Sequence, residues 1–318
     1  MEILLVGSGS ALPEKIVSND DLAKIVDTSD EWISTRTGIK ERRICEKESL
    51  SALSTLAAKR ALDAAKVDAE DIDLIVAGTT TADKSFPGCA CEVQAGIGAS
   101  HAVCFDVSAA CSGFVFALHS AECMMRAGGY RSALVLGADA FSRVLDWSDR
   151  STCVLFGDGA GAVVLKAKES ERVVDGILGT KLGSDGSRGD SLVREAFGEN
   201  PYVKMCGQEV FKFAVRTVPE VIDQALERAK ITKKEVDWYI LHQANERIIQ
   251  SVAKKLEEAM EKFPMNLSKV GNTSGASVAI LLDEEIRSGR IQKGDVLVLS
   301  GFGAGLTWGA TCLLYTSD

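Results

Sequence analysis

Continuous apolar runs alternate with amphipathic segments along most of this chain. The runs at 74–77, 133–136 and 296–299 are typical of strands buried on both faces of a sheet. Between such runs, apolar residues recur at helical spacing, as in the segments 53–64 and 218–226. This alternation predicts an α/β fold with parallel-type sheets that helices cover on both faces.

The chain also resembles itself at a fixed offset. Ala61-Leu-Asp-Ala-Ala-Lys66 returns as Ala225-Leu-Glu-Arg-Ala-Lys230, 164 residues later, and each copy precedes an apolar run. At nearly the same offset, the run 133–136 matches the run 296–299. Separately, Thr232-Lys-Lys-Glu235 has the form of a capping box before a predicted strand. We therefore expect two duplicated α/β halves, residues 1–170 and 171–318, joined by a polar hinge at 166–175.

Composition narrows the class of protein. The 318 residues are 46% hydrophobic and carry a formal net charge of −9, which suits a large core and argues against nucleic-acid binding. The uncharged span 296–315 contains four glycines and predicts two buried strands around a tight turn, not a membrane helix. The first residues lack a signal peptide's basic region and are typical of a strand. We expect a cytoplasmic protein without membrane partners.

Cysteine usage points the same way. Nine cysteines are scattered without the paired spacing of a zinc site, and the chain has only three histidines. Reduced thiols and no metal are therefore expected.

One cysteine has an unusual setting. Cys111 lies in Asp106-Val-Ser-Ala-Ala-Cys111-Ser-Gly-Phe114, where a predicted strand at 102–107 runs into a helix of small residues. The free N–H groups and positive dipole end of a helix N-terminus favour a thiolate. Such sites lower a cysteine pKa from about 8.5 to between ~3.5 and ~7.5, which predicts a nucleophile. Taken alone, Cys111 is also compatible with a small buried core thiol.

Two polar residues stand at equivalent places of the second half. His242 follows the predicted strand 238–241, and Asn272 precedes a predicted helix in Gly271-Asn-Thr-Ser-Gly275. A lone histidine is otherwise structural, and Asn-Thr-Ser alone is an N-cap signal. If a pseudo-twofold relates the halves, Cys111, His242 and Asn272 approach one pocket. A neutral imidazole and an amide donate hydrogen bonds to one carbonyl oxygen and so stabilise an enolate, while N–H groups of the turn at 300–305 suit an oxyanion hole.

With these motifs the chain resembles, nearly end to end, the β-ketoacyl-acyl-carrier-protein synthase III family, the initiating condensing enzymes of type II fatty acid synthesis. The resemblance implies a thiolase-like fold of five layers, αβαβα. It rests on Ser29-Asp-Glu-Trp-Ile33, Arg36-Thr-Gly-Ile39, Glu41-Arg-Arg43, Ser85-Phe-Pro87, 106–114, Phe156-Gly-Asp-Gly-Ala-Gly161, Leu241-His-Gln-Ala-Asn245, Gly271-Asn-Thr-Ser274 and 301–309.

The resemblance also implies residue roles. Cys111, His242 and Asn272 would form the catalytic triad, with Asn245 positioning His242, Phe302 shielding the decarboxylation site and Ala304 contributing its backbone N–H. Trp32 and Arg150 would sandwich the adenine of coenzyme A, with Arg36 at its phosphates and Gly207 and Asn245 also at the coenzyme. Acyl carrier protein would bind to Lys212, Arg247, Lys254 and Lys255, and Phe86 would close the acyl pocket of a homodimer partner. Two departures from the family pattern are Ala304, in a turn that is often all glycine, and the end 311–318, which does not follow the family's usual last strand in sequence and whose polar tail we expect to be disordered.

The implied reaction is a two-step Claisen condensation. Cys111 takes an acyl group from acyl-coenzyme A, and malonyl acyl carrier protein then loses carbon dioxide and attacks it; no cofactor is needed beyond the thioester substrate. A polyketide-type or other acyl-coenzyme A condensing enzyme is the alternative, and a cysteine hydrolase or a silent acyl-coenzyme A binder are alternatives of other classes. The primer stays open, because acetyl, branched and longer groups differ by methylenes worth about 0.8 kcal/mol each.

Overall fold

A five-stranded mixed sheet forms the first half of the fold. The computed structural model describes residues 1–196 and 198–317. In this sheet β4 pairs parallel with β5 and β6, whereas β7 pairs antiparallel with β6 and β1. The strands, in spatial order, are β1 (Glu2–Ala11), β7 (Asp158–Lys168), β6 (Ser132–Ala140), β4 (Leu74–Gly78) and β5 (Val103–Val107).

A four-stranded sheet repeats this plan in the second half. Its order is β11 (Trp238–Leu241), β12 (Val296–Gly303), β13 (Thr307–Leu314) and β8 (Gly176–Ser184). Only β11 and β12 are parallel. The prediction of parallel-type sheets is therefore wrong for β1, β7, β8 and β13. The three residues 304–306 between β12 and β13 are too few for the crossover that parallel pairing needs, so this predicted pair of strands is a hairpin.

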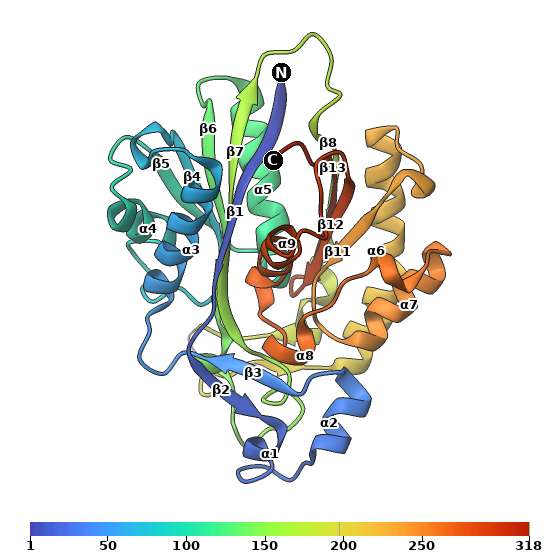
Figure 1. Cartoon of the computed structure of the whole chain (residues 1–318). Helices are drawn as coiled ribbons and strands as arrows, with labels where there is room; N and C mark the ends of the chain where they lie inside the picture. The colour runs from blue at the N-terminus through green and yellow to red at the C-terminus, as the bar shows by residue number, and fades with distance from the viewer. Residues whose placement is uncertain (197, 318) are drawn as a thin grey trace.

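Helices form the other three layers (Figure 1). On the outer face of the first sheet lie α3 (Leu50–Ala65) and α4 (Cys89–Ile97), and on that of the second lie α6 (Gly207–Ala229) and α7 (Glu246–Leu256). Between the sheets lie α5 (Gly113–Ala127) and α9 (Ser277–Arg287), which contact strands of both. The expected αβαβα order is confirmed. None of the described helices is long and apolar enough to cross a membrane.

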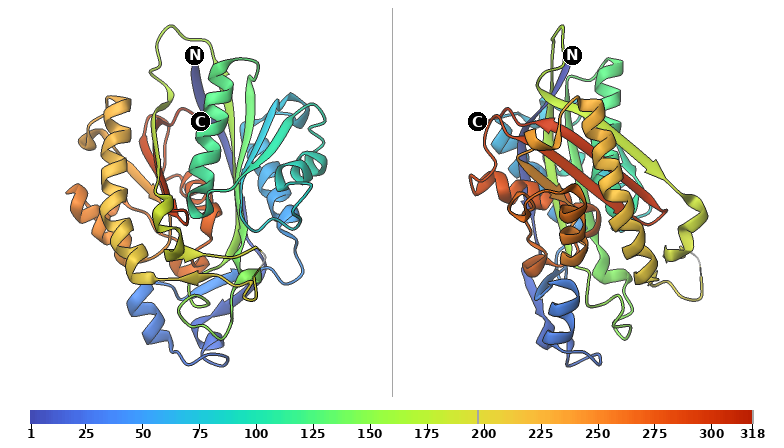
Figure 2. Two further views of the ribbon diagram at one scale, coloured as in Figure 1. Left: turned by 180° about the vertical axis from the view of Figure 1, so that it is seen from behind. Right: turned by 90° about the vertical axis from the view of Figure 1, so that its right-hand side faces the viewer.

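Smaller elements complete the chain. A unit at one end of the molecule, seen at the bottom of both views in Figure 2, carries α2 and with it Trp32. It consists of β2 (Lys15–Ser18), α1 (Asn19–Leu22), α2 (Asp30–Thr37) and β3 (Glu41–Ile44). The remaining elements are β9 (Leu192–Val193), β10 (Lys204–Met205) and α8 (Leu267–Val270).

The duplication extends to backbone conformation. Lys66 and Lys230, 164 residues apart, both end a helix in the left-handed region, with φ of 52° and 58°. The capping box of Thr232 and Glu235 forms and opens a short 3-10 turn, as the sequence predicts. All strands of the first sheet lie within residues 2–168 and those of the second within 176–314. The division at 170/171 remains our proposal, because α5 and α9 form one layer shared by both sheets.

The departure of the chain end from the family sequence does not interrupt the last strand. Residues 311–314 continue β13 and pair with β8, as the prediction of two strands within 296–315 requires. Beyond the strand, the Ser317 hydroxyl donates a hydrogen bond to the Val6 carbonyl at 3.0 Å. Asp318 of the predicted tail lies outside the described residues.

Glycines let the two central helices approach the first sheet at their N-termini. A Cβ atom on Gly78, the last residue of β4, would overlap the backbone of Gly113, the first residue of α5. One on Gly137 of β6 would overlap the carbonyl of Gly275, just before α9. Both helix N-termini therefore press on the carboxyl ends of β4 and β6 without intervening side chains.

We expect Gly137→Ala to lower the free energy of unfolding by about 1–3 kcal/mol, because the close backbone contact leaves no room for a methyl group. Gly186→Ala is the matched control, since open space faces its Cβ position, and its effect should stay within about 0.5 kcal/mol. Thermal unfolding of both variants measures the difference. Equal transition midpoints would contradict the close-contact interpretation.

Candidate active site

Cys111 lies where the fold brings the chain from β5 into α5. It occupies a 3-10 turn, Ala110–Ser112, directly before the helix, and its side chain is 4% exposed. Ala110 has a φ of 46°, an uncommon value for a residue with a side chain. From the other half, Gly303 packs so closely that a Cβ there would lie 2.7 Å from the Cys111 nitrogen. The tight backbone approach expected of the glycine turn is therefore present beside the thiol.

The predicted low pKa of this thiol is not what the structure gives. Burial raises the pKa of Cys111 to about 12, although a hydrogen bond with Ser274, 3.4 Å between Sγ and Oγ, acts in the opposite direction. The helix N-terminus is present as expected, but the enclosed apolar setting that the sequence does not reveal opposes charge on sulfur. Burial thus acts against the thiolate that the helix N-terminus favours.

Asn272 is fixed at the equivalent turn of the second half. Its side-chain oxygen accepts a hydrogen bond from the Ser274 N–H at 2.9 Å, and its backbone bonds to Leu155 and Gly157. Ser274 has a φ of 51° and precedes α9 just as Ala110 precedes α5. Because the amide oxygen is occupied, the NH₂ group is the side of the amide available to a substrate carbonyl.

His242 is held at the end of β11. Its backbone N–H donates to the Ser300 carbonyl at 2.8 Å, and its ring meets Phe302 edge-on with centroids 5.2 Å apart. Burial lowers the pKa of His242 to about 3, so the imidazole is neutral near pH 7. No described group bonds to its Nδ1. A neutral ring nitrogen carrying a proton is a hydrogen-bond donor that adds no net charge to the site.

The three side chains converge as the sequence suggested. Cys111, His242 and Asn272 line one cavity of about 180 Å³, together with Phe302 and Gly303. Cys111 also borders a second cavity of about 450 Å³, on the side of Ala304, with mostly small or apolar walls. The thiol thus lies between the cavity of the triad, which contains the hydrogen-bond donors, and the second cavity.

The residues expected at coenzyme A gather around a third cavity of about 620 Å³. Its lining includes the whole predicted set: Trp32, Arg36, Arg150, Gly207 and Asn245. This cavity shares Leu155, Gly207, Phe211 and Asn245 with the cavity of the triad, so the two cavities adjoin. Both guanidinium groups lie near the Trp32 ring, at 4.6 Å for Arg36 and 4.9 Å for Arg150.

Two residues of α7 hold the helix that carries Trp32. The Asn245 side chain donates to the Arg36 carbonyl at 3.0 Å and accepts from the Arg247 N–H at 2.8 Å. The Arg247 guanidinium donates to the Thr35 carbonyl at 2.7 Å. These bonds cap the C-terminal carbonyls of α2 and tie it to the strand end that bears His242.

The other predicted residues lie at the surface. Lys254 and Lys255 are exposed in the last turn of α7, and Lys212 lines the cavity of about 620 Å³, 3.8 Å from Glu209. Phe86 is 87% exposed and does not line the apolar cavity of its own chain. That exposure is unusual for so large an apolar side chain.

The sequence analysis gave no role to Ser274 or Asp139, both of which support the site. Ser274 contacts the Cys111 sulfur. The buried Asp139 carboxylate at the end of β6 accepts hydrogen bonds from Thr81 Oγ1 at 2.7 Å, from the Gly275 N–H at 2.9 Å and from Thr80. It therefore joins the segment after β4 to the turn before α9. An aspartate inside the otherwise apolar run 132–140 was the available signal.

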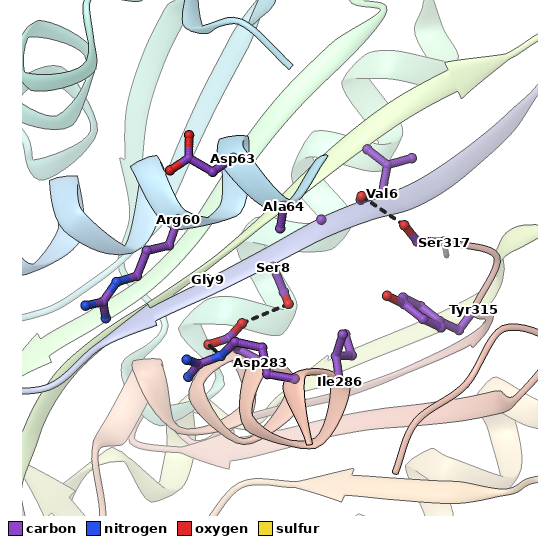
Figure 3. Close-up of a pocket in the computed structure, with 12 residues that line it drawn as sticks. Val6, Ser8, Gly9, Arg60, Asp63, Ala64, Asp283, Ile286, Tyr315 and Ser317 are labelled. Atoms are coloured by element: carbon purple, nitrogen blue, oxygen red, sulfur yellow. Dashed lines mark hydrogen bonds and ion pairs between the residues drawn. The ribbon is translucent and has the colours of Figure 1, made fainter. Parts of the chain in front are cut away.

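Other clusters offer less chemistry. Within residues 1–196 and 198–317, no three His, Cys, Asp or Glu side chains are grouped so as to hold a metal ion. A separate cavity of about 320 Å³ lies at the free edge of β1, far along the sequence from the triad turns (Figure 3). Its buried Asp283 accepts hydrogen bonds from Ser8 and Ser10 and pairs with Arg287, so the charges there are matched internally.

Comparison with known proteins identifies relatives over the whole chain. Residues 105–186 and 226–315 match the family models of 3-oxoacyl-[acyl-carrier-protein] synthase III and of its C-terminal part. β-Ketoacyl-[acyl-carrier-protein] synthase III of Xylella fastidiosa is 52% identical over 98% of both chains. The crystal structure of the Aquifex aeolicus synthase III has a TM-score of 0.94 at 47% identity, covering 98% of this chain and 100% of that one. The priming β-ketosynthase of the R1128 polyketide pathway has the same TM-score at 37% identity, covering 99% and 96%.

Burial of His242 makes stability depend on pH. Because burial lowers its pKa to about 3, the unfolded chain binds more protons than the folded one between that value and the ordinary pKa. Stability contributed by the neutral ring is complete above about pH 6.5 and is lost as pH falls, by at most about 1.4 kcal/mol per pH unit. We expect His242→Gln to flatten the fall, measured by urea unfolding at several pH values. His101→Gln, at an exposed position, is the control and should keep the parent's dependence of unfolding free energy on pH. A His242→Gln curve parallel to that of the parent would refute the assignment of the pH dependence to buried His242.

Proposed function

The chain belongs to the 3-oxoacyl-acyl-carrier-protein synthase III family, and from this premise we propose that Cys111 accepts an acyl group from acyl-coenzyme A and passes it to malonyl acyl carrier protein. The chain is a condensing acyltransferase that initiates fatty acid biosynthesis. The observation that carries the residue assignment is the single cavity shared by a thiol, a neutral imidazole and an oriented amide.

In the first step, Cys111 attacks the thioester carbonyl carbon. N–H groups of the Cys111 turn and the Ala304 turn suit the oxyanion, and collapse of the tetrahedral intermediate expels the coenzyme A thiolate. The proton leaves one sulfur and ends on the other, so this exchange of thiols consumes no net base. A protonated Cys111 in the resting site is therefore compatible with the reaction, provided that a neighbouring group relays the proton; the neutral His242 lines the same cavity.

In the second step, His242 and Asn272 bind the malonyl thioester carbonyl. Both donate hydrogen bonds to its oxygen, which stabilises the enolate formed when carbon dioxide leaves. The enolate carbon attacks the acyl-cysteine carbonyl, and the Cys111 thiolate departs and is reprotonated. Phe302, buried beside His242, presents an apolar surface that disfavours the charged carboxylate and favours its loss. The proposal needs no cofactor beyond the thioester substrate.

We assign substrate binding to two surfaces. Trp32, Arg36, Arg150, Gly207 and Asn245 border the cavity that leads to the triad, which suits the nucleotide and phosphates of coenzyme A. Lys212, Arg247, Lys254 and Lys255 offer a local basic surface on a chain of net charge −9, which suits an acidic carrier protein. Arg247 also holds α2, so Lys254 and Lys255 are the cleaner probes of docking.

A homodimer and a cytoplasmic location complete the proposal. The Phe86 side chain is exposed, and the next helix in the chain is α4. Beside α4 lies β5, which is an edge strand of the first sheet with one unpaired side. A second copy meeting this edge covers both features. We propose no membrane or nucleic-acid partner. The relatives at about half identity carry the name β-ketoacyl-[acyl-carrier-protein] synthase III, which does not favour the polyketide-type, hydrolase or silent-binder alternatives.

Intact-protein mass spectrometry tests the triad. With a panel of acyl-coenzyme A thioesters, the parent should gain an acyl adduct on Cys111, and Cys111→Ala should gain none. His242→Ala should still acylate but lose at least about 100-fold in malonyl decarboxylation, because one of two enolate donors is gone. A folded His242→Ala chain that fails to acylate would overturn the division of roles.

Charge reversal tests the docking surface. We expect Lys254→Glu with Lys255→Glu to raise KM for malonyl acyl carrier protein on the order of tenfold, through lost attraction and added repulsion. KM for acyl-coenzyme A should not change. Lys59→Glu with Lys66→Glu, on α3 and at its C-cap in the opposite outer layer, is the control of equal net charge. An equal effect of the two double variants would rule out a local docking site.

A further inference from the structure

Two cysteines outside the triad lie against each other. Cys91 of α4 and Cys104 of β5 have their sulfur atoms 3.2 Å apart, and both side chains are half-buried. The sequence draws attention instead to Cys89 and Cys91, two positions apart. In the helix these point differently, and the Cys89 sulfur lies 3.6 Å from the Ser54 hydroxyl.

Hydrogen bonds fix α4 against β5 on both sides of this thiol pair. Before it, the N–H groups of Cys89 and Ala90 donate to the Asp106 carboxylate at 2.7 and 2.8 Å. After it, the Gln94 side chain donates to the Ala102 carbonyl at 2.9 Å. The helix and the strand therefore cannot move apart without breaking charge-assisted bonds, and the two sulfur atoms stay close.

We propose that Cys91 and Cys104 are a redox-modification site, which closes to a reversible intrachain disulfide when the chain meets a low-molecular-weight disulfide such as oxidised glutathione. A disulfide places its sulfur atoms about 2.05 Å apart, so closure requires an approach of only about 1 Å. Side-chain rotation supplies such a movement without displacing either element. The proposal does not depend on the assigned reaction.

The chemistry balances as two thiol–disulfide exchanges. The Cys91 thiolate attacks one sulfur of oxidised glutathione, which forms a mixed disulfide and releases one glutathione thiolate. Cys104 then loses its proton and attacks the Cys91 sulfur, which releases the second. Two protein thiols are oxidised, one glutathione disulfide is reduced, and the two protons end on the glutathione thiols. Burial and the neighbouring thiol raise the pKa of Cys104 to about 11, so we assign the first attack to Cys91 and expect closure to speed up with pH.

One of the segments that the bridge joins leads to the second cavity of the active centre. β5 continues into residues 108–110, which line that cavity, and α4 follows the segment that carries the exposed Phe86. A bridge between α4 and β5 covalently joins these two segments.

Peptide mapping of the full-length chain tests the proposal. The reduced protein is incubated with oxidised glutathione, its remaining thiols are alkylated, and it is digested with trypsin and a glutamate-specific protease. Trypsin alone leaves both cysteines in the segment 85–126, whereas cleavage after Glu92 separates them. We expect a linked pair of peptides lacking two hydrogen atoms, absent after dithiothreitol, and an unchanged monomer band on a non-reducing denaturing gel.

Single substitutions identify the partners. Cys91→Ser and Cys104→Ser should each abolish the link and leave the remaining cysteine with a glutathione adduct, whereas Cys89→Ser should retain the link. Cys206, exposed at the start of α6, reports that the oxidant is active by forming a mixed disulfide. The proposal is overturned if Cys206 reacts while Cys91 and Cys104 stay alkylatable, if the two carry separate glutathione adducts, or if they join two chains.

Discussion

The site depends on one packing constraint, the direct contact of backbone with backbone around the turns before α5 and α9. Gly78 touches Gly113, Gly137 touches Gly275, and Gly303 touches the Cys111 turn. Any side chain at these points would separate the helix N-termini from the strand ends. Because these contacts exist, one cavity is lined by residues from four places in the sequence: Cys111, His242, Asn272 and Phe302. Asp139 reinforces the junction, since it bonds to both the Thr80–Thr81 segment and the turn before α9.

The same close packing sets the protonation states. Excluding water disfavours charge on either reactive side chain, so the pKa of Cys111 rises while that of His242 falls. The resting site is thus a neutral thiol beside a neutral imidazole. This arrangement suits a reaction in which one thiol replaces another and in which hydrogen-bond donors, not a charged acid, stabilise the enolate. It also explains why a helix N-terminus alone was an incomplete guide to the state of Cys111.

Much of the fold was accessible from local pattern. The hairpin at the chain end, the capping box at Thr232 and the 164-residue repeat were all predicted, because strand propensity, turn glycines and caps act over a few residues. Strand direction was not predicted correctly. An apolar run looks the same in a parallel and in an antiparallel pair, and its partner lies far away in sequence, as β1 and β7 illustrate. The partner of β13 was not predicted for the same reason, since β8 lies more than a hundred residues earlier in the chain.

The sequence by itself determined the chemical types at the candidate site, the duplicated plan, and the motifs shared with the synthase III family. Only the tertiary structure decided that Cys111, His242 and Asn272 line one cavity, that burial opposes a resting thiolate, that Asn245 and Arg247 hold α2, and that Cys91 meets Cys104 instead of Cys89. The reason is physical. Propensity and capping are local properties, whereas burial, dielectric surroundings and the distance between two side chains are set by groups that the fold brings from distant parts of the chain.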